Sequence, residues 1–276
     1  MRTFAALFTP KWKINKPLRA KKSYGQHFLN DENIAEHIAN SLQWTDQYNT
    51  VLEIGPGRGM LTKFLLPKAY ELFVVEADRD MVMHLQKNFP QLREHIISAD
   101  FLKVPLDQVF KQPFGLIGNF PYNISSQILF QLLQYKELIP EMVGMFQKEV
   151  AERVVAGPGS KTYGVISVLV QAFYEGEYLF SVENYSFTPP PKVRSGVIRL
   201  FRKENQDLGC DEKLFKRVVK QAFSQRRKML RNTMKTFLKG DPFLEDDFFN
   251  LRPERLSVAD FVNLTIEIGN RMPTSE

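Results

Sequence analysis

The sequence contains very little cysteine and no long hydrophobic run. Cys210 is the single cysteine in 276 residues, so neither an internal disulfide nor a multi-cysteine zinc site can form. The four histidines, His27, His37, His84 and His95, lack metal-ligand spacing, and we expect no metal site. No apolar run approaches the ~20 residues that cross a bilayer, so we expect no membrane partner. These absences favour a globular protein of a reducing compartment, and we expect a cytoplasmic location.

Acidic residues are absent from the first 30 positions, which carry seven Lys or Arg. Residues 192–239 carry fifteen basic and four acidic side chains, whereas the whole chain has a net charge of +6. The remainder of the chain therefore carries a net charge of −12. Basic segments on an acidic body usually indicate a polyanionic partner. A solvated charged surface is the alternative, but two separate segments of the same sign favour the polyanion.

Three glycines at alternate positions follow a short apolar run. Residues 51–54 (VLEI) are typical of a buried strand, Gly55, Gly57 and Gly59 come next, and residues 60–68 predict a helix. A strand, glycine turn and helix allow a small ligand to lie against bare backbone. The dinucleotide fingerprint does not fit, because its last glycine would fall on Met60 or Thr62. An acid before alternating glycines instead favours S-adenosylmethionine (SAM); a turn without a ligand is the alternative.

Strand and helix patterns alternate along most of the chain. Strands are expected at residues 51–54, 72–76, 95–98, 114–118, 142–146, 178–182 and 197–201, and helices at 31–42 (capped by Asn30), 60–68, 81–88, 125–135 and 163–174. This order predicts an α/β, Rossmann-like fold with a doubly wound, mostly parallel sheet. Apolar residues then recur at helical spacing beyond a hydrophilic linker at 202–211. We therefore expect a flexible basic arm (1–22), an α/β domain (23–204) and a small all-helical C-terminal domain (205–276).

Two acids stand at the ends of expected strands. Glu76 ends the second strand, where such folds bind a ribose diol. Asp100 follows the third strand, where its carboxylate can accept a hydrogen bond from a cofactor adenine amine, with Phe101 against the ring. A solvated strand end for Glu76 and a helix cap for Asp100 are the structural alternatives.

The most specific motif is NFPY at residues 119–122, directly after the fourth strand. It matches the [DNS]-P-P-[YF] pattern of amino methyltransferases. The Asn119 side-chain oxygen and a main-chain carbonyl near Phe120 or Pro121 can bind the two N–H groups of an adenine amine. That arrangement favours a pyramidal nitrogen whose lone pair points at the methyl donor. Tyr122 can stack on the base, which is worth ~1–3 kcal/mol; the alternative for this motif alone is a turn after a strand.

Taken together, the chain resembles the KsgA-type ribosomal RNA adenine dimethyltransferases over nearly its full length. The motifs are GQHFL at 25–29, EIGPG at 53–57, Glu76, Asp100, NFPYNIS at 119–125, QKEV at 147–150, FTPPPKV at 187–193, QRRKMLRN at 225–232 and RPERL at 252–256. His27 stands where the family commonly has asparagine. Phe120 replaces the usual leucine, and we expect little effect because residue 120 contributes mainly backbone.

The resemblance implies the roles of individual residues. The SAM-binding set, to which the reading of the residues adds Gly57 and Phe101, is His27, Leu29, Gly55, Gly57, Glu76, Asp100, Phe101 and Asn119. The catalytic set is Asn119, Pro121 and Tyr122, with Phe187 closing over the target base. The implied reaction dimethylates two adjacent adenosines in the 3′-terminal hairpin loop of small-subunit rRNA during ribosome biogenesis. The partner would be the small ribosomal subunit, and we expect a monomer.

A helix bearing four basic side chains is expected to contact rRNA phosphates. Its members are Arg226, Arg227, Lys228 and Arg231, in the domain to which we assign rRNA binding. An Erm-type large-subunit rRNA methyltransferase would share the cofactor and catalytic motifs, but residues 225–232 and 252–256 favour the KsgA type. A DNA adenine methyltransferase is disfavoured because no target-recognition domain is evident. A non-catalytic assembly factor is disfavoured by the intact Glu76, Asp100, Asn119 and Tyr122.

Overall fold

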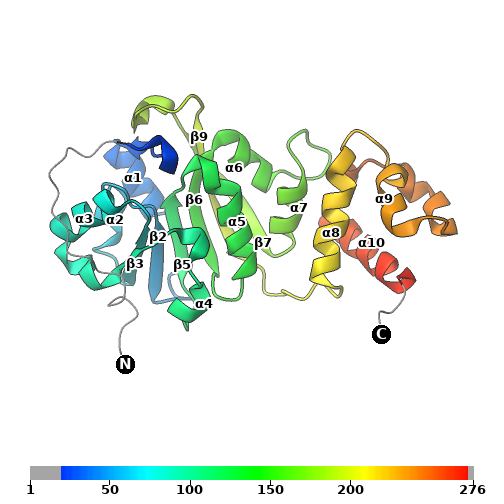
Figure 1. Cartoon of the computed structure of the whole chain (residues 1–276), viewed down its shortest axis with the longest axis horizontal. Coiled ribbons are helices and arrows are strands. Elements are labelled where there is room, and N and C mark those ends of the chain that lie inside the picture. The colour runs from blue at the N-terminus through cyan, green and yellow to red at the C-terminus, as the bar shows by residue number, and fades with distance from the viewer. Residues whose placement is uncertain (1–19, 273–276) are drawn as a thin grey trace. The chain divides into compact units, whose positions relative to one another are not determined.

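The computed structural model describes residues 20–272, so the expected basic arm lies almost entirely outside the described residues. The chain forms two compact units, which Figure 1 shows with their elements labelled. The first unit combines the chain up to Ala151 with Gly176–Arg202, and the second combines Glu152–Glu175 with the chain from Lys203 onward. This division differs from the boundary expected after residue 204 in the segment Glu152–Glu175. That segment belongs to the second unit because its helix α7 packs against α8.

The first unit is built on a seven-stranded sheet. Its elements are β1 (Phe28–Leu29), α1 (Glu32–Ala39), β2 (Thr50–Ile54), α2 (Thr62–Leu65), β3 (Glu71–Glu76), α3 (Arg79–Asn88), β4 (Ile96–Ser98), α4 (Leu106–Val109), β5 (Gly115–Asn119), α5 (Ser125–Gln134), β6 (Glu141–Gln147), α6 (Lys148–Val155), β7 (Tyr174–Val182), β8 (Phe187–Thr188) and β9 (Ser195–Arg202), of which α6 and β7 cross the division between units. The strand order is β4-β3-β2-β5-β6-β9-β7. Strands β4 to β6 pair in parallel and β9 runs antiparallel to β6. The expected mostly parallel sheet is therefore confirmed.

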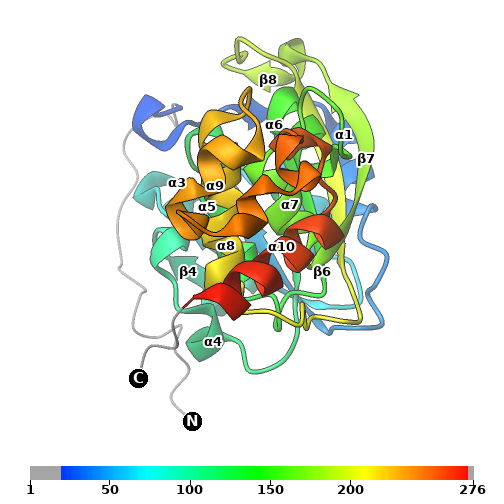
Figure 2. The same cartoon turned by 90° about the vertical axis from the view of Figure 1, so that its right-hand side faces the viewer.

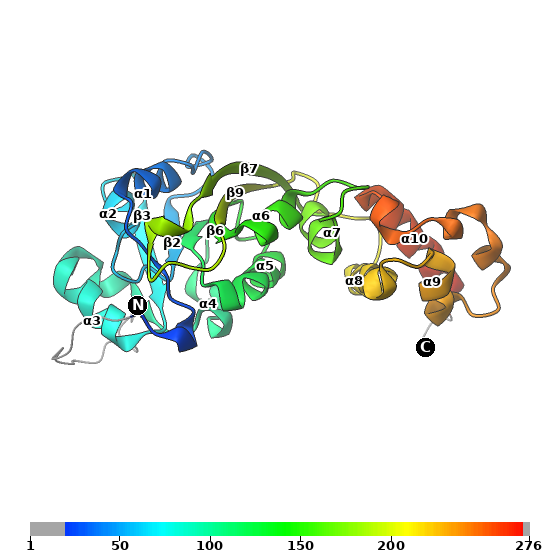
Figure 3. The same ribbon diagram turned by 90° about the horizontal axis from the view of Figure 1, so that it is seen from above.

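Both faces of this sheet are covered, as parallel strands require. Val51, Val74 and Ile117 point to one face and share a buried cluster with Ile38 of α1 and Leu65 of α2. Figure 3 shows α1 and α5 on opposite sides of the sheet. Because side chains alternate along a strand, the intervening residues face α5. The sheet thus positions its strand ends, where the glycine turn and the NFPY motif begin.

The second unit is helical, as expected for the C-terminal part of the chain. Its helices are α7 (Val165–Gln171), α8 (Glu212–Ala222), α9 (Leu230–Leu238) and α10 (Val258–Arg271), seen together in Figure 2. Phe215 and Val219 of α8, Met234 of α9, and Phe261 and Ile268 of α10 are fully or almost fully buried. Within residues 20–272, no helix has the length and apolar character needed to span a membrane.

Several local predictions are corrected. The N-cap of α1 is Asp31, whose carboxylate accepts a hydrogen bond from the Ile34 amide, and not Asn30. Asn30 instead donates to the Thr188 hydroxyl at 2.6 Å, because the antiparallel pair β1–β8 brings Leu29 opposite Phe187. The short strands of that pair and helix α6 were not expected from the sequence. The helices expected at 60–68 and 163–174 are real but shorter.

Candidate functional site

A cavity of about 450 Å³ lies in the first unit where β2, β3 and β5 end. Four stretches line it, at residues 23–29, 53–61 (without Gly59), 75–77 and 99–101, and a fifth, at 119–124, begins at the last residue of β5. The volume falls within the range of about 300–1,000 Å³ typical of small-molecule sites. Residues far apart in the sequence therefore meet at the carboxyl edge of the sheet, where α/β folds bind ligands.

The glycine turn has the backbone conformation that its composition predicts. Gly55, Gly57 and Gly59 all have positive φ, at 63°, 56° and 83°. A Cβ on Gly59 would lie 2.3 Å from the Phe89 ring, and one on Gly57 would lie 3.0 Å from the Phe28 ring. The Gly55 amide donates to the Val75 oxygen at 2.9 Å, which ties the turn to β3. The turn therefore requires glycine for its conformation at all three positions, and for space at Gly57 and Gly59.

Glu76 is oriented by main-chain amides. Its carboxylate accepts hydrogen bonds from the Gly57 amide at 3.1 Å and the Asp78 amide at 2.8 Å. Only 6% of the residue is exposed, and this burial raises the pKa of Glu76 to about 7 despite both hydrogen bonds. The ordered carboxylate lines the cavity, so the solvated strand end considered above does not describe it.

A second buried acid, Glu53, lies two residues before the first glycine of the turn. The Thr62 hydroxyl donates to its carboxylate at 2.7 Å. Burial raises the pKa of Glu53 to about 8, and the neighbouring charge of Glu76 acts in the same direction. Two buried carboxyl groups therefore flank the glycine turn, and each carries an energetic cost when ionised.

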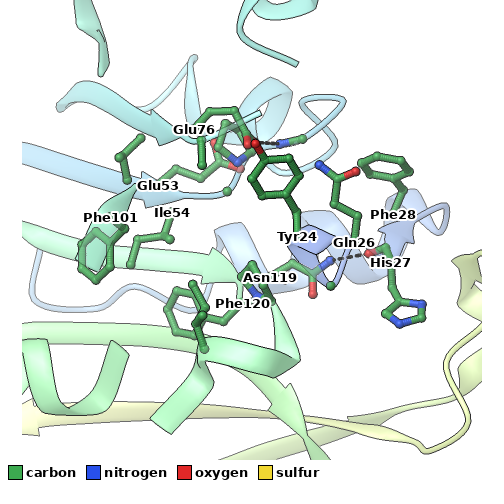
Figure 4. A pocket seen from close by; sticks show the side chains of 18 of the residues that line it. Tyr24, Gln26, His27, Phe28, Glu53, Ile54, Glu76, Phe101, Asn119 and Phe120 are labelled. Atoms are coloured by element: carbon green, nitrogen blue, oxygen red, sulfur yellow. Dashed lines mark hydrogen bonds between the residues drawn. The ribbon is translucent and has the colours of Figure 1, made fainter. Parts of the chain in front are cut away.

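The Asn119 amide faces a main-chain carbonyl. Its Nδ2 donates to the His27 oxygen at 3.1 Å, a contact drawn in Figure 4. Because a carbonyl only accepts hydrogen bonds, this contact fixes the amide rotamer and leaves Oδ1 as the remaining acceptor. The Pro121 carbonyl already accepts from the Ile124 amide at 3.2 Å, which favours Phe120 as the source of the main-chain acceptor.

The Phe120 side chain is packed in the interior of the protein. It is 1% exposed and meets the Phe146 ring edge-on at a centroid distance of 5.0 Å. A Cβ on Gly118 or Gly144 would approach the Phe120 ring to 2.7 Å or 2.3 Å, so the two glycines make room for it. The expectation that residue 120 contributes mainly backbone therefore understates its packing, which anchors the loop behind Asn119.

Tyr122 and His27 form a stacked pair. Their ring centroids lie 5.4 Å apart with an interplanar angle of 29°. The Tyr122 hydroxyl lies 2.6 Å from the Ser195 hydroxyl, and His27 Nδ1 lies 2.8 Å from the Pro189 oxygen. Figure 4 shows the imidazole directed away from Glu76. The His27 side chain thus lies beside the tyrosine, and it is the His27 main chain that bonds Asn119.

Comparisons with known proteins agree with this geometry. Residues 18–250 match the family described as ribosomal RNA adenine dimethylase. The ribosomal RNA small subunit methyltransferase A of Bacteroides thetaiotaomicron is 52% identical over 262 residues, which cover 94% of this chain and 98% of that protein. The chain belongs to the ribosomal RNA adenine dimethylase family. The resemblance identified from the motifs is confirmed, and with it the expected enzyme class, a SAM-dependent rRNA adenine dimethyltransferase.

Other relatives extend the comparison. The ribosomal RNA small subunit methyltransferase A of Flavobacterium johnsoniae is 55% identical over 252 residues, covering 91% of this chain and 96% of that protein. A dimethyladenosine transferase from Plasmodium falciparum has a TM-score of 0.75 at 27% identity over 89% of this chain and 98% of its own. The 23S rRNA methyltransferase ErmE has a TM-score of 0.64 at 22% identity, over 88% and 99% of the two chains, and shows the same fold. The expected Rossmann-like methyltransferase fold is thereby confirmed.

The expected cofactor and catalytic residues of this family member meet in the cavity, with one exception. The lining includes His27, Leu29, Gly55, Gly57, Glu76, Asp100, Phe101, Asn119, Pro121 and Tyr122. Phe187 is only 2% exposed and packs in the core cluster with Leu29, outside this lining. Asp100 also caps the turn that follows it, because its carboxylate accepts from the Leu102 amide at 3.1 Å. The cap considered as an alternative is therefore present, and the other carboxylate oxygen, Oδ2, lies 3.9 Å from Lys103 Nζ.

The basic run of the second unit is not one helix. Arg226, Arg227 and Lys228 lie in the turn before α9, and only Arg231 lies on that helix. Arg227 and Lys228 are exposed, whereas Arg226 donates to the Ser160 oxygen at 3.1 Å. The helical periodicity of the following apolar residues extended the expected helix too far toward the N-terminus.

Cavity residues that the sequence did not single out come from β1 and the segment before it. Tyr24, Gln26 and Phe28 line the cavity, and the Arg58 guanidinium lies 4.5 Å from the Phe28 ring centroid. The only signal for them is their place inside or next to the GQHFL motif. Their spatial neighbours are distant in the chain, so no local pattern identifies them.

Proposed function

We propose that this chain transfers methyl groups from SAM to the exocyclic amines of two adjacent adenosines in the 3′-terminal hairpin loop of small-subunit rRNA, dimethylating each. The observation that carries the proposal is the Asn119 amide, held by the His27 carbonyl so that Oδ1 is the available acceptor. Family membership supports rRNA adenine as the target class.

The residues around the cavity suit SAM. When bound, SAM supplies an electrophilic methyl group on a sulfonium. The Glu76 carboxylate lines the cavity with acceptor capacity for a ribose diol, and Asp100 with Phe101 can bind an adenine edge and face. The bare backbone of Gly55 and Gly57 permits close approach of the ligand. We therefore assign these side chains to cofactor binding.

The chain's own residues would prepare the target amine. Asn119 Oδ1 and the Phe120 carbonyl can accept the two N–H hydrogens of an adenine amine. Holding both hydrogens favours a pyramidal nitrogen whose lone pair is directed toward the methyl donor. Tyr122 can stack on the base, and its own plane is set by His27 and Ser195. Such alignment is settled before the reaction and lowers the barrier through orientation.

Recognition of RNA is assigned to both units. Loop adenosines can be splayed from their stack, which modification of a base requires. Arg227, Lys228 and Arg231 of the second unit supply positive charge for phosphates. We expect the small ribosomal subunit as partner, a monomeric enzyme and a cytoplasmic location.

A map of dimethyladenosine in rRNA, with and without this gene, tests the proposal. We expect the two loop adenosines of small-subunit rRNA to lose dimethylation in the deletion strain and regain it on complementation. Purified protein and labelled SAM should modify subunits from the deletion strain and leave subunits from the parent strain unlabelled. Label appearing in large-subunit rRNA instead would support the Erm-type alternative and refute the proposed target.

A further inference from the structure

One wall of the cavity is a segment with little regular structure. Residues 21–29, the wall segment, contain the 3₁₀ turn Lys22–Tyr24 and the two-residue strand β1. Tyr24, Gln26 and Phe28 of this segment line the cavity, and the Phe28 ring lies next to Gly57 of the glycine turn. Main-chain pairing with β8 holds residues 28 and 29, and we attribute the position of residues 21–26 to their side chains.

Lys21 supplies the strongest of these attachments. Its Nζ lies 2.5 Å from Asp78 Oδ1 and 2.7 Å from Asp80 Oδ2. The Asp78 side chain is 0% exposed, whereas that of Asp80 is 48% exposed. A buried carboxylate without a cation is costly, so the pair with Asp78 carries the interaction. Partial burial lowers the pKa of Lys21, but the hydrogen bonds and charges of both acids outweigh it and raise the pKa.

Gln26 binds the same carboxylate and also the main chain of Lys21. Its Nε2 donates to Asp78 Oδ2 at 3.1 Å, and its Oε1 accepts from the Lys21 amide at 2.8 Å. Lys21 Nζ also lies 5.9 Å from the centroid of the Tyr24 ring. Both ends of the turn that lines the cavity are thus attached to Asp78.

Asp78 belongs to the turn that orients Glu76. Its amide donates to Glu76 Oε1 at 2.8 Å, and its carboxylate accepts from the Asp80 amide at 3.0 Å at the start of α3. The wall segment is therefore attached to the turn that orients the acid assigned to the ribose. Lys21 itself does not line the cavity, so any effect on the cofactor must pass through these contacts.

We propose that Lys21 is a positioning residue, which with Gln26 attaches the wall segment to Asp78 and so shapes the SAM site. The inference rests on the proposed cofactor. It predicts that loss of Lys21 weakens SAM binding more than it slows methyl transfer. A role limited to neutralising Asp78 predicts instead a change in folding stability with no separate effect on SAM.

The test compares Lys21→Met, Lys21→Arg and a matched control, Lys63→Met, which breaks the exposed pair with Glu32 in the same unit. SAM affinity is measured by calorimetry, and KM for SAM and kcat are measured on small subunits from the deletion strain. We expect Lys21→Met to raise Kd and KM for SAM about tenfold while kcat changes less than threefold. For Lys21→Arg these constants should stay within threefold of wild type, and for Lys63→Met they should equal those of wild type.

Two further variants keep the inference testable if Lys21→Met folds poorly. Lys21→Met with Asp78→Asn removes both charges, and we expect recovered thermal stability with KM for SAM still at least fivefold raised. Gln26→Ala leaves the ion pair intact and should raise KM about threefold. Full recovery of KM in the double variant, or unchanged SAM affinity in every variant, would overturn the inference. Wild-type protein that fails to bind SAM would contradict the proposed function instead.

Discussion

The side-chain amide of Asn119 donates to the main-chain oxygen of His27 at 3.1 Å, across a large separation in sequence. The contact gives residue 27 a role that does not depend on its side chain. The substitution of histidine for the family's usual asparagine therefore leaves this hydrogen bond intact. The imidazole instead stacks on Tyr122, so the same residue orients two parts of the NFPY motif.

Asn119→Ala should abolish methyl transfer and preserve SAM binding. Removing a positioned hydrogen-bonding group of this kind costs roughly 10²–10³-fold in rate. Asn119→Asp should also be inactive, because its carboxylate would face the His27 carbonyl with no hydrogen to donate. Tyr122→Phe is the control and should retain most activity, since the ring remains and only the Ser195 contact is lost. Near-normal transfer of labelled methyl by Asn119→Ala would contradict the paired-acceptor mechanism.

The binding of a nucleoside should depend on the ionisation of Glu76. Burial raises the pKa of Glu76 to about 7, so the carboxylate proposed to accept ribose hydroxyls becomes protonated as the pH falls through 7. If the ionised form binds, affinity at pH 6 should be about tenfold lower than at pH 8. 5′-Methylthioadenosine is the suitable probe because it lacks the titratable amino acid of SAM. Glu76→Gln should bind weakly with no such pH dependence, and a flat wild-type profile would count against this role.

The sequence predicted the parts of the site that local pattern determines. The strand at 51–54, the glycines after it and the NFPY motif each combine hydrophobic periodicity with unusual turn chemistry within a few residues. Glu76 and Asp100 followed because carboxyl ends of parallel strands meet at one edge of a sheet. Those positions line one cavity in the structure.

The sequence did not predict the long-range contacts. The β1–β8 pair joins two strands of two residues each, too short for any period to reveal. The same pairing buries Phe187 in the core rather than in the cavity lining. The hydrogen bonds of the Asp78 carboxylate join Lys21 and Gln26 to a turn some fifty residues away in sequence. Such contacts depend on tertiary packing, which a single sequence does not display.

Glu53→Gln should stabilise the protein at alkaline pH. Burial raises the pKa of Glu53 from 4.5 to about 8, so the native state retains a proton that the unfolded chain releases between those values. Stability from this group is therefore greatest below pH 4.5 and falls as the pH rises toward 8. At pH 8.5 the variant should gain at least ~1 kcal/mol, or roughly 2–4 °C in Tm.

The gain from Glu53→Gln should shrink at pH 6, since the wild-type carboxyl is then largely protonated. Thermal unfolding across pH 6 to 8.5 measures the difference between variant and wild type. Glu32→Gln, at a side chain that is 68% exposed, serves as control and should show little change. A Tm difference that does not vary with pH would rule out buried ionisation as the cause.

Gly59→Ala should destabilise the first unit more than Gly55→Ala. Both residues have positive φ, so each substitution costs roughly 1–2 kcal/mol in backbone strain. At Gly59 the new methyl would also lie 2.3 Å from the Phe89 ring, whereas at Gly55 its nearest neighbour is Pro121 at 3.8 Å. Overpacking adds about 1–3 kcal/mol. Denaturant unfolding of the two variants should separate them by that amount, and equal losses would contradict it.

The two exposed cations before α9 should contribute to rRNA binding, while Arg226 should contribute to folding. Arg227→Glu with Lys228→Glu is expected to weaken co-sedimentation with small subunits and to reduce its salt dependence, because phosphate contacts release counterions. SAM affinity should not change. Lys87→Glu with Lys111→Glu, two exposed sites of the first unit, makes the same charge change and should bind subunits nearly as wild type does. Arg226→Glu should instead lower Tm, since its guanidinium is bonded to the Ser160 carbonyl. Equal loss of subunit binding in both double variants would show that net charge, and not this turn, determines the interaction.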